Sequence, residues 1–395
     1  MSVEKLRYIN TEPQPSEEAE QLVRQLGVET AVGVQHFHAS LPGYAPTALY
    51  DLRSLASELG VKHIFIKDES TRFGLKAFKA LGGSYAMAQL LGARLGLRNP
   101  VFEELLAAKA KLGKIQFVSV TDGNHGRGVA WMAHELGYRA QIYMPAGTVQ
   151  ARVDNITQVG GEVTVTSMNY DETVRYLRQE AEQHGWVMVQ DTDWPGYEAI
   201  PLNVMQGYTT MAKELVEQLG GEVPTHVLLQ AGVGSMAAAV VAYLVDWYRS
   251  RGYELPRFII VEPTVAGCYY ATAAAGDGRA HSVGGAMSSM MAGLCCGEPC
   301  AMAWTLLRAY AGSYVVLEDE LDAEGMRRLA HPLQGDTGIE SGESGAAGFS
   351  VGLAALTRPE LDLRRQWQLD ASSVLLCINT EGATDGENYA KVINS

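Results

Sequence analysis

Cysteine is scarce in this sequence, with five residues among 395. A small, odd number in a long chain does not fit a disulfide scaffold and is typical of proteins from a reducing cytoplasm. Cys295, Cys296 and Cys300 lack the spacing of a zinc site, and no run of paired histidines accompanies them. His36-Phe37-His38 alternates like a strand without further metal-type neighbours, so we expect it to be structural. The sequence therefore predicts a cytoplasmic protein without a metal site.

Long apolar runs and an excess of basic charge are also missing. The longest apolar run, near Met236–Val245, is far shorter than a membrane span, and no basic N-terminal segment with an apolar core marks a secretory signal. The formal net charge of -14 argues against nucleic acid as a partner. The 42 glycines follow no collagen-like period. What remains is a chain with 47% apolar residues, which is enough for well-buried cores.

Strand-like apolar segments alternate with amphipathic, helix-like segments through most of the chain. The predicted strands are His63–Lys67, Ile115–Val120, Ala140–Met144, Glu162–Val165, Val187–Val189, His226–Gln230, Arg257–Val261 and Ser373–Asn379. The predicted helices include Gly126–Leu136, Val149–Val159, Tyr170–His184, Met205–Leu219 and Met236–Tyr248. This order predicts an α/β protein of two domains, each with a mainly parallel twisted sheet flanked by helices. From the topology we place a large, discontinuous domain at residues 1–92 and 195–395 and a small domain at 93–194.

Lys79 is the first candidate for chemistry. It lies in the stretch Phe73–Gly83, where a predicted strand gives way to a helix, directly after Phe78 and shortly before two glycines. An amine held inside a cleft can lose its proton through desolvation and attack a carbonyl carbon, which is the start of Schiff-base chemistry. Lys76 is the alternative, and we expect it to face solvent. A lone helix lysine is usually solvated, so the interpretation depends on two further motifs downstream.

The second motif is the turn Thr121–Gly128, which joins a predicted strand to a helix. Such a turn presents backbone N–H groups at a helix N-terminus, and its Asn124 can donate or accept a hydrogen bond beside a flat ring. Asp122 is the unusual member, because a carboxylate is unfavourable where amides would welcome an anion unless a cation also binds. An N-cap role for Asp122 is equally compatible with the sequence.

The third motif is the glycine loop Gln230–Met236, again between a strand and a helix. Its glycines, one serine hydroxyl and the helix N-terminus can hold a single phosphate group. A dinucleotide fold would need a third glycine where Ala237 stands, although Glu262 follows the next strand as that fold requires. A nucleoside-triphosphate loop would need a Gly-Lys-Ser/Thr sequence, which is missing. A lone phosphate is the better interpretation.

Together these three motifs resemble the fold-type II pyridoxal-phosphate enzymes, the tryptophan synthase β-like family, from Pro46 to the end of the chain. The resemblance implies that Lys79 carries the cofactor, that Asn124 meets its ring hydroxyl oxygen and that Thr380 stands beside the pyridine nitrogen. A neutral partner there leaves that nitrogen unprotonated and favours elimination. The implied cofactor-binding residues are Lys79, Asn124, Gly232, Val233, Gly234, Ser235, Met236 and Thr380. Glu340–Gly345 resembles a further glycine-containing region of the family, but Glu343 is an additional residue relative to the family's pattern.

Three longer sequence segments resemble one subgroup of this family, the diaminopropionate ammonia-lyases. These segments are Lys67–Leu75, Thr121–Trp131 and Ser341–Ala346. Dehydratases of the family typically carry Ser-Ala-Gly-Asn-His where this sequence has Thr-Asp-Gly-Asn-His. Diaminopropionate brings a second ammonium, which a cleft carboxylate such as Asp122 can pair with. The resemblance also raises Asp191, at a predicted strand end, as a catalytic base, although a helix-cap or loop role fits the sequence as well.

The expected function is α,β-elimination of D- and L-2,3-diaminopropionate to pyruvate and two ammonia. Lys79, Asp122 and Asp191 are the expected catalytic residues, with Asp122 on the L side or at the leaving amine and Asp191 on the D side. The alternatives are a serine/threonine-type dehydratase of the same fold and a non-catalytic module that binds pyridoxal phosphate or a nucleotide. The expected assembly is a homodimer. The sequence leaves open a disulfide between Cys268 and Cys296, because both lie near the predicted cleft, although cytosolic disulfides are uncommon.

Overall fold

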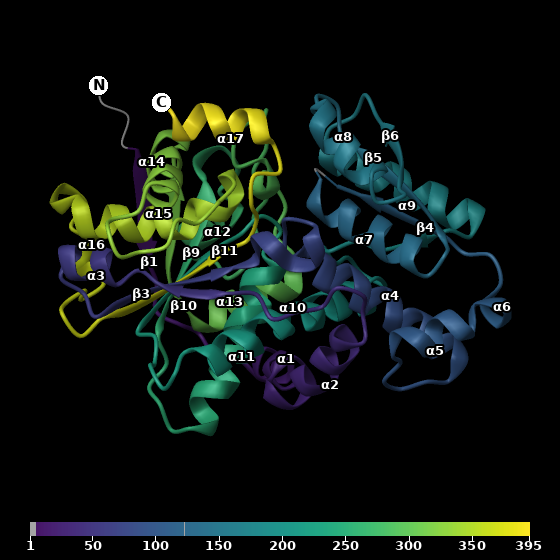
Figure 1. Ribbon diagram of the computed structural model, residues 1–395, viewed down its shortest axis with the longest axis horizontal. Coiled ribbons are helices and arrows are strands. Elements are labelled where there is room, and N and C mark those ends of the chain that lie inside the picture. The colour runs from purple at the N-terminus through teal and green to yellow at the C-terminus, as the bar shows by residue number, and fades with distance from the viewer. Residues whose placement is uncertain (1–4, 122) are drawn as a thin grey trace.

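The structure is a computed structural model that describes residues 5–121 and 123–395. Figure 1 shows two bodies side by side, a larger one built on one sheet and a smaller one built on another. The N-terminal strand β1 (Leu6–Asn10) and the C-terminal helix α17 (Gly386–Ile393) both belong to the larger body. Asp122, one of the expected catalytic acids, lies outside the described residues.

The larger sheet has a parallel centre and antiparallel edges. Within the described residues its spatial order is β1, β10 (Ala311–Leu317), β9 (Arg257–Pro263), β8 (His226–Gln230), β11 (Val374–Asn379), β3 (His63–Asp68) and β2 (Leu49–Asp51). The five central strands run parallel to one another, whereas β1 pairs with β10 and β2 pairs with β3 in antiparallel fashion. The carboxyl ends of the central strands therefore meet at one edge of the sheet.

Helices cover both faces of the larger sheet. Val227 and Leu229 of β8 belong to one core, and Leu228 between them belongs to another. Because side chains alternate along a strand, a sheet covered on both faces needs apolar residues at every position, and β8 is buried throughout. The helices of this body are α1 (Glu17–Leu26), α2 (Val28–Ala39), α3 (Arg53–Leu59), α10 (Ala199–Gln218), α11 (Ser235–Ser250), α12 (Cys268–Ala275), α13 (Ala301–Tyr310), α14 (Asp319–Ala330), α15 (Glu343–Thr357), α16 (Leu363–Gln366) and α17. Figure 1 shows α14 and α15 above the sheet and α1 and α11 below it.

The smaller sheet is parallel throughout, in the order β6 (Glu162–Val165), β5 (Arg139–Met144), β4 (Gln116–Val120) and β7 (Val187–Met188). Its helices are α5 (Phe102–Ala107), α6 (Lys109–Leu112), α7 (Asn124–Glu135), α8 (Gln150–Thr157) and α9 (Tyr170–His184). The division of the chain at residues 93 and 194 stays a prediction, although the two sheets are separate.

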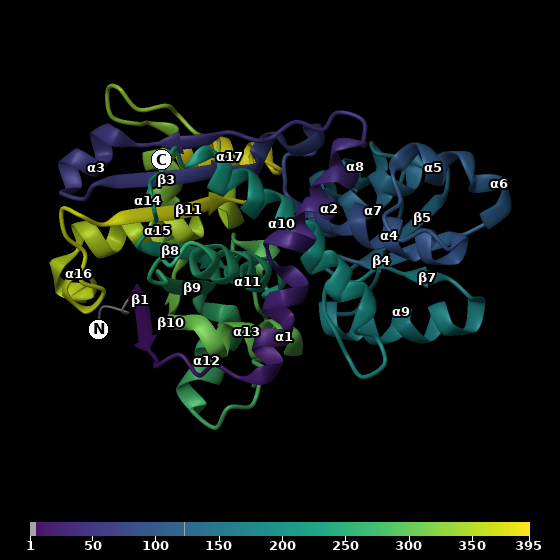
Figure 2. The same ribbon diagram turned by 90° about the horizontal axis from the view of Figure 1, so that it is seen from below.

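Helix α4 (Lys79–Leu95) joins the two bodies, because it packs against α10 on one side and α7 on the other. Figure 2 shows α10 and α2 at the boundary between the bodies. Glycines allow the close approach: a Cβ at Gly128 would lie 2.8 Å from the Cα of Ala80, and one at Gly207 would lie 2.3 Å from the carbonyl oxygen of Leu81. The helix that begins at Lys79 is therefore held by backbone contacts from both sides.

The predicted α/β class with mainly parallel sheets is confirmed. The sequence pattern did not predict the strands β1, β2 and β10. The strand-like interpretation of His36-Phe37-His38 is wrong, because these residues lie in α2, where Val34, Phe37 and His38 are buried at helical spacing. Three alternating residues are too few to distinguish a strand from a helix. Among residues 5–121 and 123–395, the helices lack the combination of length and apolar character that crossing a bilayer needs.

Candidate active site

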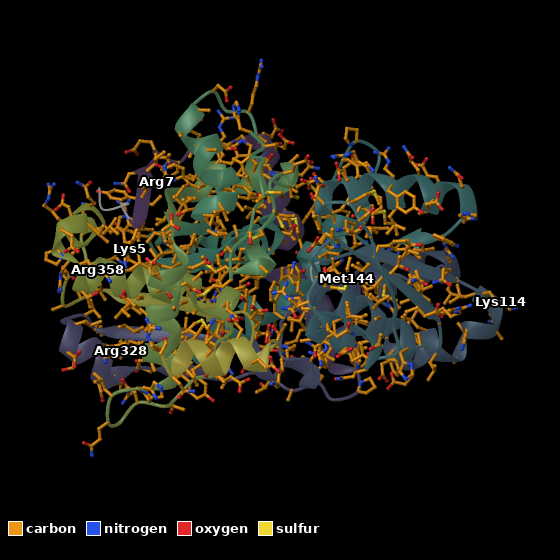
Figure 3. All side chains as sticks on the ribbon, turned by 90° about the horizontal axis from the view of Figure 1, so that it is seen from above. Lys5, Arg7, Lys114, Met144, Arg328 and Arg358 are labelled. Atoms are coloured by element: carbon orange, nitrogen blue, oxygen red, sulfur yellow. The ribbon has the colours of Figure 1, made fainter. Side chains whose placement is uncertain are left out.

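A cavity of about 650 Å³ opens between the two bodies and is lined by residues from both. Val120 at the end of β4, Gln230 at the end of β8 and Thr380 just after β11 all line it. This is where parallel α/β sheets usually place their sites, beyond the carboxyl ends of the strands. Figure 3 shows Met144, the last residue of β5, on the side of the smaller body that faces the larger one, whereas Lys114 lies at the far end.

Lys79 projects into this cavity from the first position of α4. Its Nζ donates to Oδ2 of Asp191 at 2.6 Å, and its side chain is 20% exposed. The preceding turn fixes its place, since Phe73 and Lys76 both have positive φ and the Phe78 N–H donates to the Thr380 carbonyl oxygen. Lys76 pairs instead with Glu340 at 3.4 Å and is 47% exposed, as expected for the solvent-facing rival.

Asp191 is buried beside the Lys79 amine. Two residues, Val189 and Gln190, separate it from the end of the short strand β7. Burial by itself raises the pKa of the Asp191 carboxyl, but the nearby charges of Lys79 and His125 and the hydrogen bond from Lys79 outweigh burial and lower the pKa to about 2. Asp191 is thus ionised at neutral pH, and its charge pairs with that of the Lys79 amine. The Ser235 hydroxyl donates to its carbonyl oxygen at 2.6 Å and ties this segment to the glycine loop.

The glycine loop ends at the N-terminus of α11, a helix of 16 residues whose first turn lines the cavity. Gly234 has φ of +91°, and a Cβ there would lie 2.1 Å from the Tyr269 hydroxyl oxygen, so only glycine fits. Gly232, Val233 and Met236 line the cavity with it. Because Ser235 uses its hydroxyl on Asp191, the loop offers an anion mainly backbone N–H groups and the positive end of the helix.

Asn124 and Thr380 complete the expected set. Asn124 begins α7 and its amide nitrogen donates to Oε2 of Glu381. The Thr380 hydroxyl accepts a hydrogen bond from Nε2 of Gln230 at 3.0 Å and donates one to the Ser344 carbonyl oxygen at 3.3 Å. These immediate partners of Thr380 are neutral. Such surroundings suit an unprotonated ring nitrogen.

The structure brings together every described residue that the sequence analysis assigns to the site. They reach the cavity from both bodies: Lys79, Asn124, Asp191, Gly232, Val233, Gly234, Ser235, Met236 and Thr380. No position is assigned to Asp122, which lies outside the described residues. Glu381 also lines the cavity and was not predicted from the sequence, where its one signal is its place directly after Thr380. The roles of the predicted site residues stay predictions.

This set of groups fits pyridoxal phosphate. The amine of Lys79 suits an aldehyde carbon, the glycine loop at the α11 N-terminus suits a phosphate, Thr380 suits the pyridine nitrogen and Asn124 suits the ring hydroxyl. A group of three or more metal-type side chains does not occur in the part of the chain that the structure describes. All five cysteines are described and none of them forms a disulfide, so Cys268 and Cys296 are not joined in this structure.

Comparison with known proteins agrees with this fit. The family model "Pyridoxal-phosphate dependent enzyme" matches residues 40–380, most of the chain. The chain belongs to this family. It is 49% identical to the diaminopropionate ammonia-lyase of Escherichia coli (strain K12) over 364 residues, which are 91% of this chain and 90% of that one. By this likeness the chain also belongs among the diaminopropionate ammonia-lyases, and the predicted family is confirmed.

Solved structures of the Escherichia coli diaminopropionate ammonia-lyase share the whole fold. The holo crystal structure has a TM-score of 0.89 at 45% identity and covers 98% of this chain and 96% of its own. A second crystal structure of that enzyme, in complex with an aminoacrylate-PLP azomethine reaction intermediate, has a TM-score of 0.88 at 44% identity and covers 98% of this chain and 97% of its own. The expected fold type II architecture is therefore confirmed.

Proposed function

We propose that the protein is a pyridoxal phosphate-dependent carbon–nitrogen lyase that converts 2,3-diaminopropionate to pyruvate and two ammonia. The observation that carries the proposal is the pair of Lys79 and the buried Asp191, 2.6 Å apart, inside a cavity whose other groups suit the cofactor. The likeness to diaminopropionate ammonia-lyase over 91% of the chain supports the substrate. An amine and an ionised carboxylate at one point can hold and move protons at the substrate's α-carbon and amines.

When bound, pyridoxal phosphate supplies the electron sink that accepts the electrons released at the α-carbon. The chain would hold the cofactor through Lys79, the glycine loop, Asn124 and Thr380. We assign the α-proton on one face of the substrate to Lys79 and the α-proton on the other face to the ionised carboxylate of Asp191. Loss of the β-amine as ammonia leaves aminoacrylate. Water then converts free aminoacrylate to pyruvate and the second ammonia.

Bases on opposite faces explain how both isomers can react. We assign the L isomer to Lys79 and the D isomer to Asp191, and we place Asp122 on the L side, where it pairs with the second ammonium of the substrate. The assignment of Asp122 rests on its place in the Thr121–Gly128 turn, because the structure does not describe this residue. A serine/threonine-type dehydratase has no use for that extra carboxylate, since its leaving group is a hydroxyl.

The test is pyruvate formation from D- and L-diaminopropionate and from serine, with the wild type, Asp122→Asn and Asp191→Asn. Asp191→Asn should lower turnover of the D isomer about 100-fold or more and affect the L isomer far less. Asp122→Asn should lower turnover of the L isomer more than turnover of the D isomer. Asp193→Asn is the matched control, because that carboxylate binds the N-terminus of α13 rather than a group in the cavity. Equal losses on both isomers would contradict the two-base model, and a wild type that prefers serine would contradict the substrate.

Three further proposals concern the whole molecule. A homodimer is supported by the family resemblance, and sedimentation velocity would test it. A cytoplasmic location is supported by five cysteines that form no disulfide, and fractionation of the source cells would test it. The division into 1–92 with 195–395 and 93–194 is supported by the two separate sheets, and limited proteolysis near the boundaries would test it.

A further inference from the structure

Glu381 is a buried acid that the proposed reaction does not use. It follows Thr380 directly, lines the cavity and is 5% exposed. Burying a carboxylate costs free energy unless it is fully hydrogen-bonded. Its contacts therefore indicate what it does.

Both carboxylate oxygens of Glu381 accept N–H groups. Oε1 accepts from the backbone N–H of Ser344 at 3.0 Å, and Oε2 accepts from the side-chain amide of Asn124. Burial raises the pKa of Glu381, as does nearby Glu343, whereas Arg152 and the two N–H donors oppose that rise. Used in this way, the group is an acceptor on both sides, which is the role of an ionised carboxylate.

A carboxylate partner fixes which way an asparagine amide faces. The oxygen and nitrogen of an amide have nearly the same shape, but the amide oxygen cannot face a carboxylate oxygen without repulsion. The nitrogen of Asn124 therefore faces Glu381. That nitrogen carries two N–H groups, and Glu381 accepts one of them.

We propose that Glu381 is a positioning residue that holds the Asn124 amide with its nitrogen toward the cofactor site, so that the remaining N–H donates to the ring hydroxyl oxygen of pyridoxal phosphate. The proposal rests on the proposed cofactor function and on the place that the family resemblance gives to Asn124. It adds a residue that acts through Asn124 and does not itself touch the cofactor. A donor at that oxygen stabilises its ionised form.

Glu381→Gln tests this inference with almost no change of shape. The two donors face different oxygens of Glu381, and a glutamine has an oxygen at only one of these positions, so it can face either Asn124 or the Ser344 N–H with its acceptor, but not both. If its oxygen stays with Ser344, its amide donates toward Asn124 and favours the reversed asparagine, which withdraws the N–H from the cofactor. Apoprotein is titrated with pyridoxal phosphate, and both the dissociation constant and the absorption spectrum of the bound cofactor are recorded. We expect binding about 10- to 100-fold weaker and a shift of absorbance from the visible band toward shorter wavelength.

A double-mutant cycle separates positioning from a general structural role. If Glu381 acts through Asn124, then Glu381→Gln should change the dissociation constant less than about threefold when Asn124 is already alanine. An effect in the Asn124→Ala background as large as in the wild type would overturn the proposal. So would wild-type binding and spectrum in Glu381→Gln alone.

Glu381→Met guards against a variant that fails to fold. This change removes the acceptor without offering a donor, so the asparagine can still turn its nitrogen to the ring oxygen, and the spectrum should shift less than in Glu381→Gln. An equal or larger shift in Glu381→Met would contradict the orientation argument. Chemical unfolding of each apoprotein reports the structural cost separately. If the wild-type apoprotein itself does not bind pyridoxal phosphate, the proposed function fails before Glu381 is in question.

Discussion

Two lysine–carboxylate pairs whose lysines lie close together in the sequence have different surroundings. Lys67 of β3 donates to the Thr47 carbonyl oxygen, to Glu214 and to Gln218, all within 2.9 Å, and its side chain is fully buried. Lys79 donates to Asp191 and keeps 20% of its side chain exposed where it lines the cavity. An ammonium has three donors, so Lys67 is saturated by neighbours that do not move.

The neighbours of Lys67 form a closed ionic cluster. Arg72 joins Glu69 at 2.8 Å and Glu214 at 2.7 Å, all of them buried. Burial lowers the pKa of Lys67, although Glu69 and Glu214 oppose this. The comparison teaches that burial and a carboxylate partner are not sufficient for a chemical role. The amine must also reach a space that a ligand can enter.

The largest expected effect is the loss of cofactor linkage and turnover when Lys79, but not Lys67, is replaced. Lys79→Ala should abolish lysine-linked cofactor and lower turnover at least about 10³-fold, because it removes both the nucleophile and one of the two bases. The checks are cofactor absorbance after dialysis and peptide mapping after borohydride reduction. Lys76→Ala is the matched control, and loss of the linkage in that variant instead would reassign the anchor.

The next largest effect is on the free energy of unfolding, to which we expect Lys67 to contribute strongly. Lys67→Met should lower the free energy of unfolding by about 3–5 kcal/mol, because it leaves a buried carboxylate cluster short of one cation. Lys76→Met, whose pair with Glu340 is half exposed, should cost about 0–1 kcal/mol. Urea unfolding of the apoproteins measures both. The structural role of Lys67 would be contradicted if Lys67→Met had the same free energy of unfolding as the wild type, or if it lost the cofactor linkage while it remained folded.

A smaller effect is expected at the loop that faces the cavity from the other side. Gly234→Ala combines a positive φ with a clash against the Tyr269 hydroxyl, so we expect pyridoxal phosphate to bind about 10- to 100-fold more weakly. Gly252→Ala is the control, because its φ is +69° and a Cβ there would meet nothing within 4 Å. Equal affinities in the two variants would place the phosphate away from this loop.

The smallest effect concerns pH. The pKa of Asp191 falls from 3.8 to about 2 on folding, so the ionised carboxylate contributes stability that is fully present above pH 4. Since the pKa is lowered in the folded state, this contribution of about 2 kcal/mol is lost as the pH falls from about 4 toward 2. The difference in unfolding free energy between wild-type and Asp191→Asn apoproteins should therefore shrink between pH 6 and pH 3. A difference independent of pH would mean that Lys79 does not stabilise the charge.

The sequence by itself determined the class of fold and identified many of the residues that line the cavity. Parallel strands buried on both faces leave continuous apolar runs, from which β3, β4, β8, β9 and β11 were predicted, and the more exposed strands β5 to β7 were predicted with them. Edge strands carry a weaker signal, because they are partly exposed, and β1 and β2 were missed. β10 was also missed although it is buried throughout, because it follows α13 with no turn residues between them. The glycine loop, Asn124 and Lys79 could be located because helix N-termini after strands require particular local residues.

Only the tertiary structure decided which distant groups meet. Asp191 lies 112 residues beyond Lys79, and Glu381 lies 257 residues beyond Asn124, yet each pair is in hydrogen-bond contact. Such contacts depend on the order of strands in two sheets and on how the two bodies face each other across the cavity, neither of which leaves a local pattern. The same dependence explains why the sequence alone could not separate the saturated Lys67 from the accessible Lys79. Both follow or lie in an apolar strand, and only the packing around each amine closes one and leaves the other open.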